Sequence, residues 1–161
     1  MLKALLIVTV AVSGLTQASR SSFQDAAWSG PKLLIKAQGE SQDSSGRRLA
    51  FEVSIDGSDG PAGVVQLRPK FSGAPEVLLP SPLRAVLVIP GPGTLREIWL
   101  IDETAAILAN QTCQRVQVPA GADRLFCDGV GSSRSIDLRT GATQEAVPFN
   151  RAALEFLRSP N

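Results

Sequence analysis

A strict two-residue alternation near the middle of the chain is the feature that most limits its fold. Large apolar side chains occupy the odd positions from 49 to 55, and mostly polar side chains occupy the even positions from 50 to 56. The apolar members are Leu49, Phe51, Val53 and Ile55. Side chains of a β-strand point alternately to opposite faces, so this pattern predicts a strand with one buried face and one solvent-facing side.

Most of the remaining chain also consists of short strand-like runs separated by turns rich in glycine, proline and aspartate. Residues 83–89 form a nearly continuous apolar run, which is typical of a strand covered on both faces. Residues 69–82 contain four prolines, so we expect a long loop or an edge strand there. The sequence therefore predicts a mainly β fold, an antiparallel sandwich or half-open barrel of about eight or nine short strands.

The last residues change to a helical pattern. Asn150 is a suitable N-cap, and Phe149 before it can pack on Leu154 as a hydrophobic staple. Apolar residues in 153–157 then follow one face of a helix. We expect a short C-terminal α-helix.

One segment, Ile136 to Gly141, is similar to a hairpin turn of β-propellers. No repeat of fixed period accompanies it, and the chain is short for a complete propeller. Taken alone, the segment predicts a turn between two strands.

The two cysteines, Cys113 and Cys127, are the only thiols in the chain. They are equidistant from Ala120, which lies in a Pro-Ala-Gly-Ala turn between two strand-like runs. A hairpin turning about Ala120 would place the two cysteines opposite each other, close enough for a cross-strand disulfide. Neither thiol belongs to a Cys-x-x-Cys motif, so we expect a structural role.

The N-terminus has the pattern of a cleavable signal peptide. Lys3 precedes an apolar stretch, and small residues at Thr16 and Ala18 form a cleavage site. The apolar stretch, residues 4–15, is shorter than the roughly 20 residues that a membrane-spanning helix needs. We expect residues 1–18 to be removed, residues 19–30 to form a flexible lead-in, and residues 31–161 to form one β-rich domain in an extracytoplasmic location, either periplasmic or secreted.

Composition excludes several function classes. The chain has no histidine and no tyrosine, so Ser-His-Asp and Cys-His catalysis and histidine-ligated metals are ruled out. Without residues 1–18 it has 15 basic and 15 acidic residues, and no run holds more than two adjacent basic side chains. Nucleic acid and anionic membranes are therefore poor candidate partners, and no cofactor is expected.

Carboxylates are the remaining groups for acid–base catalysis. The best pairs are Asp102 with Glu103 and Asp123 with Asp128. Two carboxyl groups that face each other across a cleft can hydrolyse a glycosidic bond. Both pairs lie at expected turns, where exposed acidic residues are ordinary.

Two further motifs each have a simpler alternative. Asp56, Ser58 and Asp59 provide closely spaced oxygen atoms that could bind calcium, but Asp-Gly pairs between strands mainly form hairpin turns. Asn110 begins an Asn-Gln-Thr acceptor sequence for N-glycosylation, which has meaning only in a eukaryotic secretory pathway.

Candidate contact residues are aromatic or apolar and lie outside the predicted core strands. Trp28 lies in the lead-in, and Val77, Leu78 and Leu79 lie in the proline-rich segment. These residues could cover the sheet or contact a partner. Trp99, in the middle of a predicted strand, is expected in the core.

Export, the missing histidine and the neutral charge favour a non-enzymatic binding or accessory module whose partner is a protein or a hydrophobic ligand. Trp28-Ser29-Gly30, followed by meandering strands and a proline-rich insertion, resembles the bacterial outer-membrane lipoprotein carriers. That resemblance covers residues 28–101, contains no specific motif, and implies a half-barrel that holds acyl chains. A carrier of lipid or acylated cargo is thus the first alternative, and a carboxylate-based hydrolase is the second.

Overall fold

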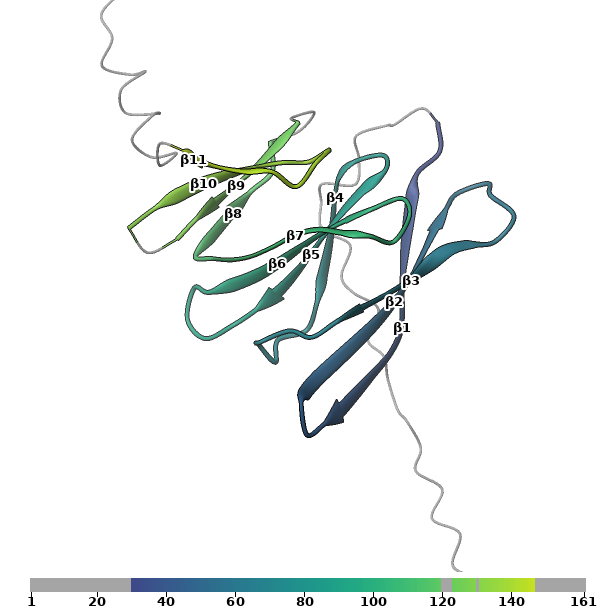
Figure 1. Ribbon diagram of the computed structural model, residues 1–161, viewed down its shortest axis with the longest axis horizontal. Coiled ribbons are helices and arrows are strands. Elements are labelled where there is room, and N and C mark those ends of the chain that lie inside the picture. Colours follow the sequence, from purple (N-terminus) through teal and green to yellow (C-terminus); the bar gives the residue numbers. More distant parts are fainter. Residues whose placement is uncertain (1–29, 120–122, 130, 147–161) are drawn as a thin grey trace, which may run out of the picture.

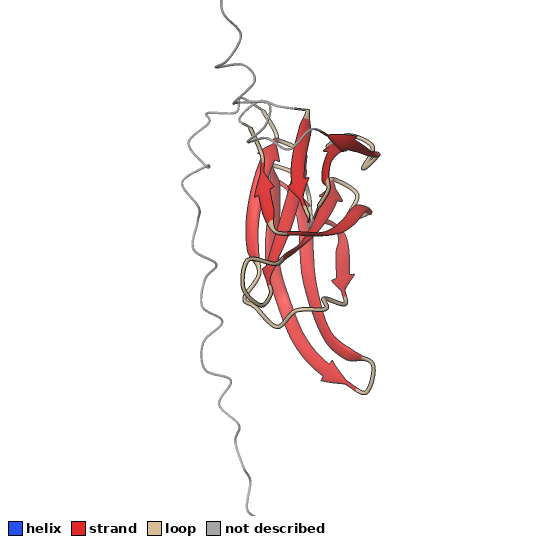
Figure 2. Cartoon of the chain, turned by 90° about the vertical axis from the view of Figure 1, so that its left-hand side faces the viewer, coloured by secondary structure: helices blue, strands red, loops and turns tan. Residues whose placement is uncertain are grey.

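The computed structural model describes residues 30–119, 123–129 and 131–146, and in these ranges the chain contains strands and loops only (Figure 2). Eleven strands form three antiparallel sheets. Sheet A comprises β1 (Leu33–Asp43), β2 (Gly46–Ile55) and β3 (Pro61–Leu67). Sheet B comprises β4 (Glu76–Ser81), β5 (Arg84–Pro90), β6 (Arg96–Asp102) and β7 (Ile107–Cys113). Sheet C comprises β8 (Arg115–Gln117), β9 (Arg124–Asp128), β10 (Ser133–Asp137) and β11 (Thr143–Ala146).

Each sheet is a meander, in which strands that follow one another in the chain also pair with one another. The sheets succeed each other in chain order across the molecule, with sheet B in the middle (Figure 1). The backbone N–H of Leu33 donates to the carbonyl of Pro82, 2.6 Å away, so β1 and β5 begin at the same end of the molecule.

Two separate hydrophobic cores hold the three sheets together. The core between sheets A and B is formed by Leu33, Leu49, Phe51, Val53, Val65, Leu67, Ala85, Leu87, Ile89 and Ile101. The core between sheets B and C is formed by Val86, Val88, Ile98, Leu100, Cys113, Leu125, Cys127, Ile136 and Leu138. Successive residues of β5 alternate between the two cores, as the pleat of a strand requires.

The central position of sheet B explains the apolar run at residues 83–89. All five residues from Ala85 to Ile89 are buried, because both faces of β5 are covered. The alternation in residues 49–55 has the opposite cause: β2 belongs to sheet A, and only the face that contains Phe51 packs on sheet B. Both expectations are confirmed.

The proline-rich segment contains an edge strand, one of the two forms expected for it. Strand β4 lies at the edge of sheet B, and its pairing with β5 shifts between Leu78 and Ser81, around Pro80. A proline has no N–H to donate, so an edge position and an irregular register accommodate it.

The predicted arrangement of strands needs correction. The described residues form a stack of three sheets with eleven strands, rather than one two-sheet sandwich or half-open barrel of eight or nine. The expectation failed because the middle sheet has two buried faces, and the sequence does not show which sheet each strand joins. The predicted C-terminal helix lies outside the described residues.

Sheets B and C repeat one arrangement. In each sheet, the arginine that begins the second strand lies opposite the aspartate that ends the third strand. The next pair of residues along these two strands is an apolar residue opposite an isoleucine. The pairs are Arg84–Asp102 and Ala85–Ile101 in sheet B, and Arg124–Asp137 and Leu125–Ile136 in sheet C. The propeller-like hairpin at Ile136 therefore has a counterpart at Ile101. Four-stranded meanders stacked in chain order are also the building plan of β-propellers, although three sheets close no ring.

The last hairpin turn of sheet B and the last hairpin turn of sheet C each contain a residue with left-handed backbone conformation. Ala105 has φ of 65° in the β6–β7 turn, and Gly141 has φ of 74° in the β10–β11 turn. A side chain at position 141 would overlap the backbone carbonyl of Leu108 in sheet B, so glycine is required there for space as well as for conformation.

We expect Gly141→Ala to destabilise the protein more than Gly93→Ala, a matched control. Gly93 also has a positive φ, of 61°, but no atom lies within 4 Å of its missing side chain. The free energy of unfolding of Gly93→Ala should fall by about 1–2 kcal/mol, because alanine is strained in the left-handed conformation. That of Gly141→Ala should fall by roughly 1–3 kcal/mol more, because the new side chain overlaps the Leu108 carbonyl. Urea unfolding of both variants measures the difference, and equal losses would contradict the packing described for this turn.

Candidate functional site

An open pocket of about 440 Å³ lies at the end of sheets B and C that carries the β4–β5, β6–β7 and β10–β11 turns. We call this end of the two sheets the hairpin end. The pocket is lined by Ser81, Pro82, Leu83, Arg84, Glu103, Asp123, Leu138 and Arg139. These residues come from the β4–β5 turn, the β6–β7 turn, the segment before β9 and the β10–β11 turn. The pocket therefore combines apolar side chains with charged groups of both signs.

Arg84 organises the floor of this pocket. Its guanidinium donates to the carbonyl of Leu138 at 2.9 Å and to the carbonyl of Leu83 at 2.7 Å, and it forms an ion pair with Glu103. The Arg84 side chain is only 14% exposed, and these partners balance its charge and accept hydrogen bonds from its Nε and Nη1 atoms. The contact with Leu138 also ties sheet B to sheet C at this end.

The structure brings two of the four predicted catalytic carboxylates to one pocket. Glu103 and Asp123 both line it, although Glu103 is paired with Arg84. Asp128 lies in β9, where its carboxylate accepts a hydrogen bond from the Ser133 hydroxyl at 2.7 Å. Asp102 is engaged in the β6–β7 turn.

Aspartates hold two of the hairpin turns at this end, β6–β7 and β10–β11. One carboxylate oxygen of Asp102 accepts hydrogen bonds from the backbone and hydroxyl of Thr104, at 2.9 and 2.7 Å, and from the backbone of Ala106. Asp137 accepts from the backbone and hydroxyl of Thr140, at 2.8 and 2.9 Å, and from the backbone of Arg139. These are the turn-forming contacts expected of aspartate.

The same hydrogen bonds control the ionisation of the Asp102 and Asp137 carboxyl groups. Partial burial acts to raise the pKa of Asp102, but hydrogen bonds from Thr104 and Ala106 outweigh it, and the pKa lies below its usual value. Hydrogen bonds from the backbone and hydroxyl of Thr140 lower the pKa of Asp137. Both carboxylates are therefore charged at neutral pH and stabilise the turns as acceptors.

The lowered pKa of Asp137 predicts a loss of stability in acid. A carboxyl group whose pKa is lower in the folded state stabilises the protein above the unfolded-state pKa, about 3.9, and this contribution is lost as pH falls through the folded value. We expect Asp137→Asn to show a flatter decline of unfolding free energy below about pH 4 than the unmodified protein.

Thr140→Val provides the comparison for that measurement. It removes the hydroxyl donor and keeps the backbone donors, so the pKa of Asp137 measured by NMR should rise toward its usual value. The interpretation fails if the acid slopes of Asp137→Asn and the unmodified protein coincide.

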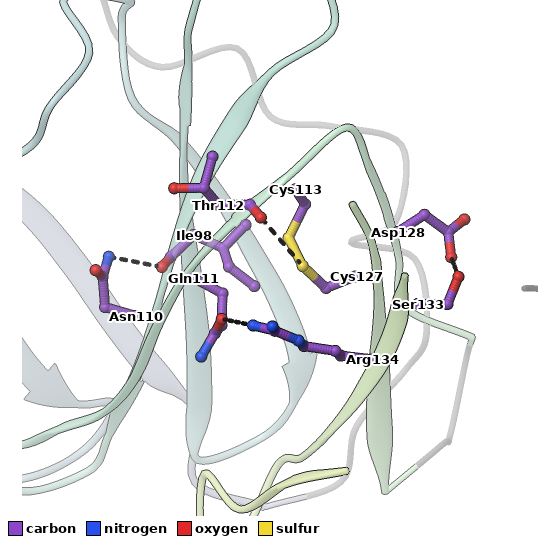
Figure 3. Close-up of a disulfide and its surroundings, with 9 residues drawn as sticks. All are labelled: Ile98, Asn110, Gln111, Thr112, Cys113, Cys127, Asp128, Ser133 and Arg134. Carbon is purple, nitrogen blue, oxygen red and sulfur yellow. Dashed lines mark hydrogen bonds between the residues drawn. A yellow bond between two sulfur atoms is a disulfide. The ribbon is translucent and has the colours of Figure 1, made fainter. Parts of the chain in front are cut away.

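The disulfide between Cys113 and Cys127 is present, with a Cα–Cα distance of 5.3 Å (Figure 3). Its predicted position is wrong in one respect. Cys113 ends β7 in sheet B, whereas Cys127 lies in β9 of sheet C, where Val116 is its partner across the hairpin. The register centres between residues 121 and 122 instead of at Ala120, so the disulfide joins two sheets rather than two strands of one hairpin. Both cysteines are buried in the core between sheets B and C.

We expect replacement of both cysteines by alanine to lower the free energy of unfolding by about 3 kcal/mol, because the closed loop of about 15 residues limits the unfolded chain. Urea unfolding with and without a reductant measures this effect. The reductant should weaken the unmodified protein and leave the double variant unchanged. Equal stability of the oxidised protein and the double variant would contradict the role as a staple.

Sequence reasoning missed a buried carboxylate, Glu97 in β6. Its side chain is 1% exposed and accepts hydrogen bonds from the backbone of Lys70 at 2.7 Å and from the Asn110 amide at 3.2 Å. Glu97 thereby fixes the segment that leads from sheet A to sheet B. The one available sign was an acidic residue in the apolar run 95–101.

The structure places the other predicted site residues as follows. The Asn110 amide nitrogen also donates to the carbonyl of Ile98 at 3.1 Å, so this group is engaged within sheet B. The Ser58 hydroxyl donates to the carbonyls of Ile55 and Gly60, as in a hairpin turn. In the described residues no group of three or more cysteine, aspartate or glutamate side chains converges to hold a metal ion, and Asp56 and Asp59 are exposed.

The predicted contact residues lie partly in the cores. Val77 and Leu79 pack against the core between sheets A and B, and Leu78 packs against the core between sheets B and C. Trp99 packs against the first of these cores, as expected. Trp28 lies outside the described residues, as do the predicted signal peptide and most of the lead-in.

No known protein family, curated protein or solved structure shows significant similarity to the chain. Across the described residues, no helix has the length and apolar character needed to cross a membrane. The disulfide is the structural feature that points to an oxidising environment.

Proposed function

We propose that this chain is an exported, non-enzymatic binding module whose partner protein contacts the pocket between sheets B and C. Export rests on the signal-peptide pattern of residues 1–18 and on the disulfide, which persists in oxidising compartments. The balanced charge of the chain argues against a polyanionic partner.

The observation that supports this proposal most directly is that three acidic side chains at the hairpin end already have partners within the protein. Asp102 and Asp137 accept the hydrogen bonds that hold two turns, and Glu103 neutralises Arg84. Groups that are engaged in this way shape a surface and are not free to transfer protons. The apolar side chains of Pro82 and Leu83 then supply area for contact, and the exposed Arg139 supplies polar specificity.

Site-specific photo-crosslinking in the producing cells tests this proposal. A photoreactive residue at Arg139, in the pocket, should form a discrete adduct with a protein of another mass. The same residue at Thr94, which is exposed in the β5–β6 turn at the opposite end of sheet B, is the control and should form none. The proposal fails if the pocket position gives no adduct, or if both positions give the same adducts.

A carboxylate-based hydrolase is the second candidate, because Glu103 and Asp123 line the same pocket. Hydrolysis by two carboxyl groups needs both of them, since one donates a proton and the other attacks or activates water. Asp123→Asn separates the two candidates. It would abolish hydrolysis, whereas an adduct formed at Arg139 should persist.

The lipid-carrier alternative has weaker support. A carrier encloses acyl chains in a cavity, but side chains from facing sheets pack against one another between sheets A and B and between sheets B and C. Binding of a hydrophobic fluorophore by the purified protein would favour this alternative over the binding module.

A further inference from the structure

The outer face of sheet C, on the side away from sheet B, is more buried than an uncovered sheet face. Ser133 and Ser135 in β10 are 7% and 6% exposed, and Phe126 in β9 is half-buried. The side-chain oxygen of Gln117 in β8 is buried as well and accepts no hydrogen bond within the described residues. Sheet C is nevertheless the last sheet of the stack, and no strand of the described ranges lies beyond it (Figure 1). Buried polar atoms normally have a partner, so a further element is expected on this face.

The register shows what such an element would meet. One row across the outer face runs from β8 to β11 through Gln117, Phe126, Ser135 and Gln144. Arg124 donates to the Ser135 hydroxyl at 3.2 Å and to the Gln144 side chain at 2.9 Å, so the polar groups on the β11 side are already paired. Phe126, in the middle of the row, belongs to neither hydrophobic core. The face therefore offers one large aromatic ring among short or paired polar side chains, which suits an apolar surface.

The chain provides a segment with such a surface directly after β11. This strand is the edge of sheet C and ends at Ala146, and Pro148 prevents it from continuing. The helix expected from Asn150 onward has two distinct sides at helical spacing. Its apolar side carries Ala153, Leu154, Phe156 and Leu157, and its polar side carries Arg151, Glu155 and Arg158.

The length of this segment also matches the face. Residues 150–158 would form a helix about 14 Å long, at about 1.5 Å per residue. The distance from β8 to β11 across the four strands is likewise about 14 Å, because neighbouring strands lie about 4.8 Å apart. One helix can thus reach from the edge at β11 to Gln117.

We propose that residues 150–158 form a helix that lies across the outer face of sheet C, with Leu154 and Leu157 over Phe126. The inner face of sheet C is packed on sheet B, so the outer face is the one that a helix joined to β11 through residues 147–149 can cover. The polar side of the helix then faces water and closes this end of the stack, as capping units do in repeat proteins. This inference does not depend on the proposed binding pocket, which lies between sheets B and C.

Labelling of an introduced thiol tests the proposal in the full mature chain. The native cysteines are bonded to each other, so Ser135→Cys provides the only free thiol, and the exchange of oxygen for sulfur changes the side chain little. Leu157→Gln should raise the rate of maleimide labelling at this thiol at least about tenfold, because loss of a buried leucine increases the fraction of molecules with a detached helix. Glu155→Gln, a matched change on the polar side of the helix, should leave the rate unchanged.

Ser54→Cys, on the outer face of sheet A, is the control for position, and its labelling rate should respond to neither helix variant. Equal labelling rates of Ser135→Cys with Leu157→Gln and with Glu155→Gln would overturn the proposal, because sheet C alone would then account for the burial. A rate that falls as the protein concentration rises would show that a second copy covers the face, which would also overturn it. So would an equal acceleration at Ser54→Cys, because Leu157 would then support the whole fold instead of a local cover.

Discussion

Burial of sheet B on both faces is the constraint on which the rest of the structure depends. Successive residues of β5 enter two different cores, so the strand is apolar without interruption from Ala85 to Ile89. Sheets A and C each cover one of these faces. Removal of apolar area from water is the main stabilising term in such a stack, and both cores share the middle sheet. The disulfide adds a covalent bond between sheets B and C in the second core.

The hairpin end of the stack shows how polar groups are used once the cores are set. Aspartates hold two turns, Arg84 joins the pocket floor to Leu138 of the neighbouring sheet, and Glu103 balances the arginine charge. Charged groups with this many internal partners define the shape of a surface. The binding role proposed for this pocket rests on this arrangement of its charged groups.

Repetition relates sheets B and C, whereas the two ends of the stack differ. The arginine–aspartate pairing and the threonine-supported turn recur in both sheets. The arginine and the aspartate lie further apart along the chain in sheet B because its second and third strands have seven residues each, whereas those of sheet C have five each. The outer face of sheet A carries the exposed Leu34 and Val64, whereas on the outer face of sheet C the Arg124 side chain donates to Ser135 and Gln144.

The sequence by itself determined the β class, the one-sided strand at residues 49–55, the doubly buried strand at 83–89, the exclusion of the proline-rich segment from a central strand and the pairing of the two cysteines. Each of these follows from local pattern: the pleat of a strand, the missing N–H of proline, or the presence of two thiols and no third. Only the tertiary structure decided that the strands divide among three sheets, that Cys113 and Cys127 belong to different sheets, and that Glu103 and Asp123 share a pocket. These features depend on which strands pair and in what register. A shift of one or two residues in a hairpin, as between Ala120 and the observed centre, leaves the local pattern unchanged and moves every partner across it.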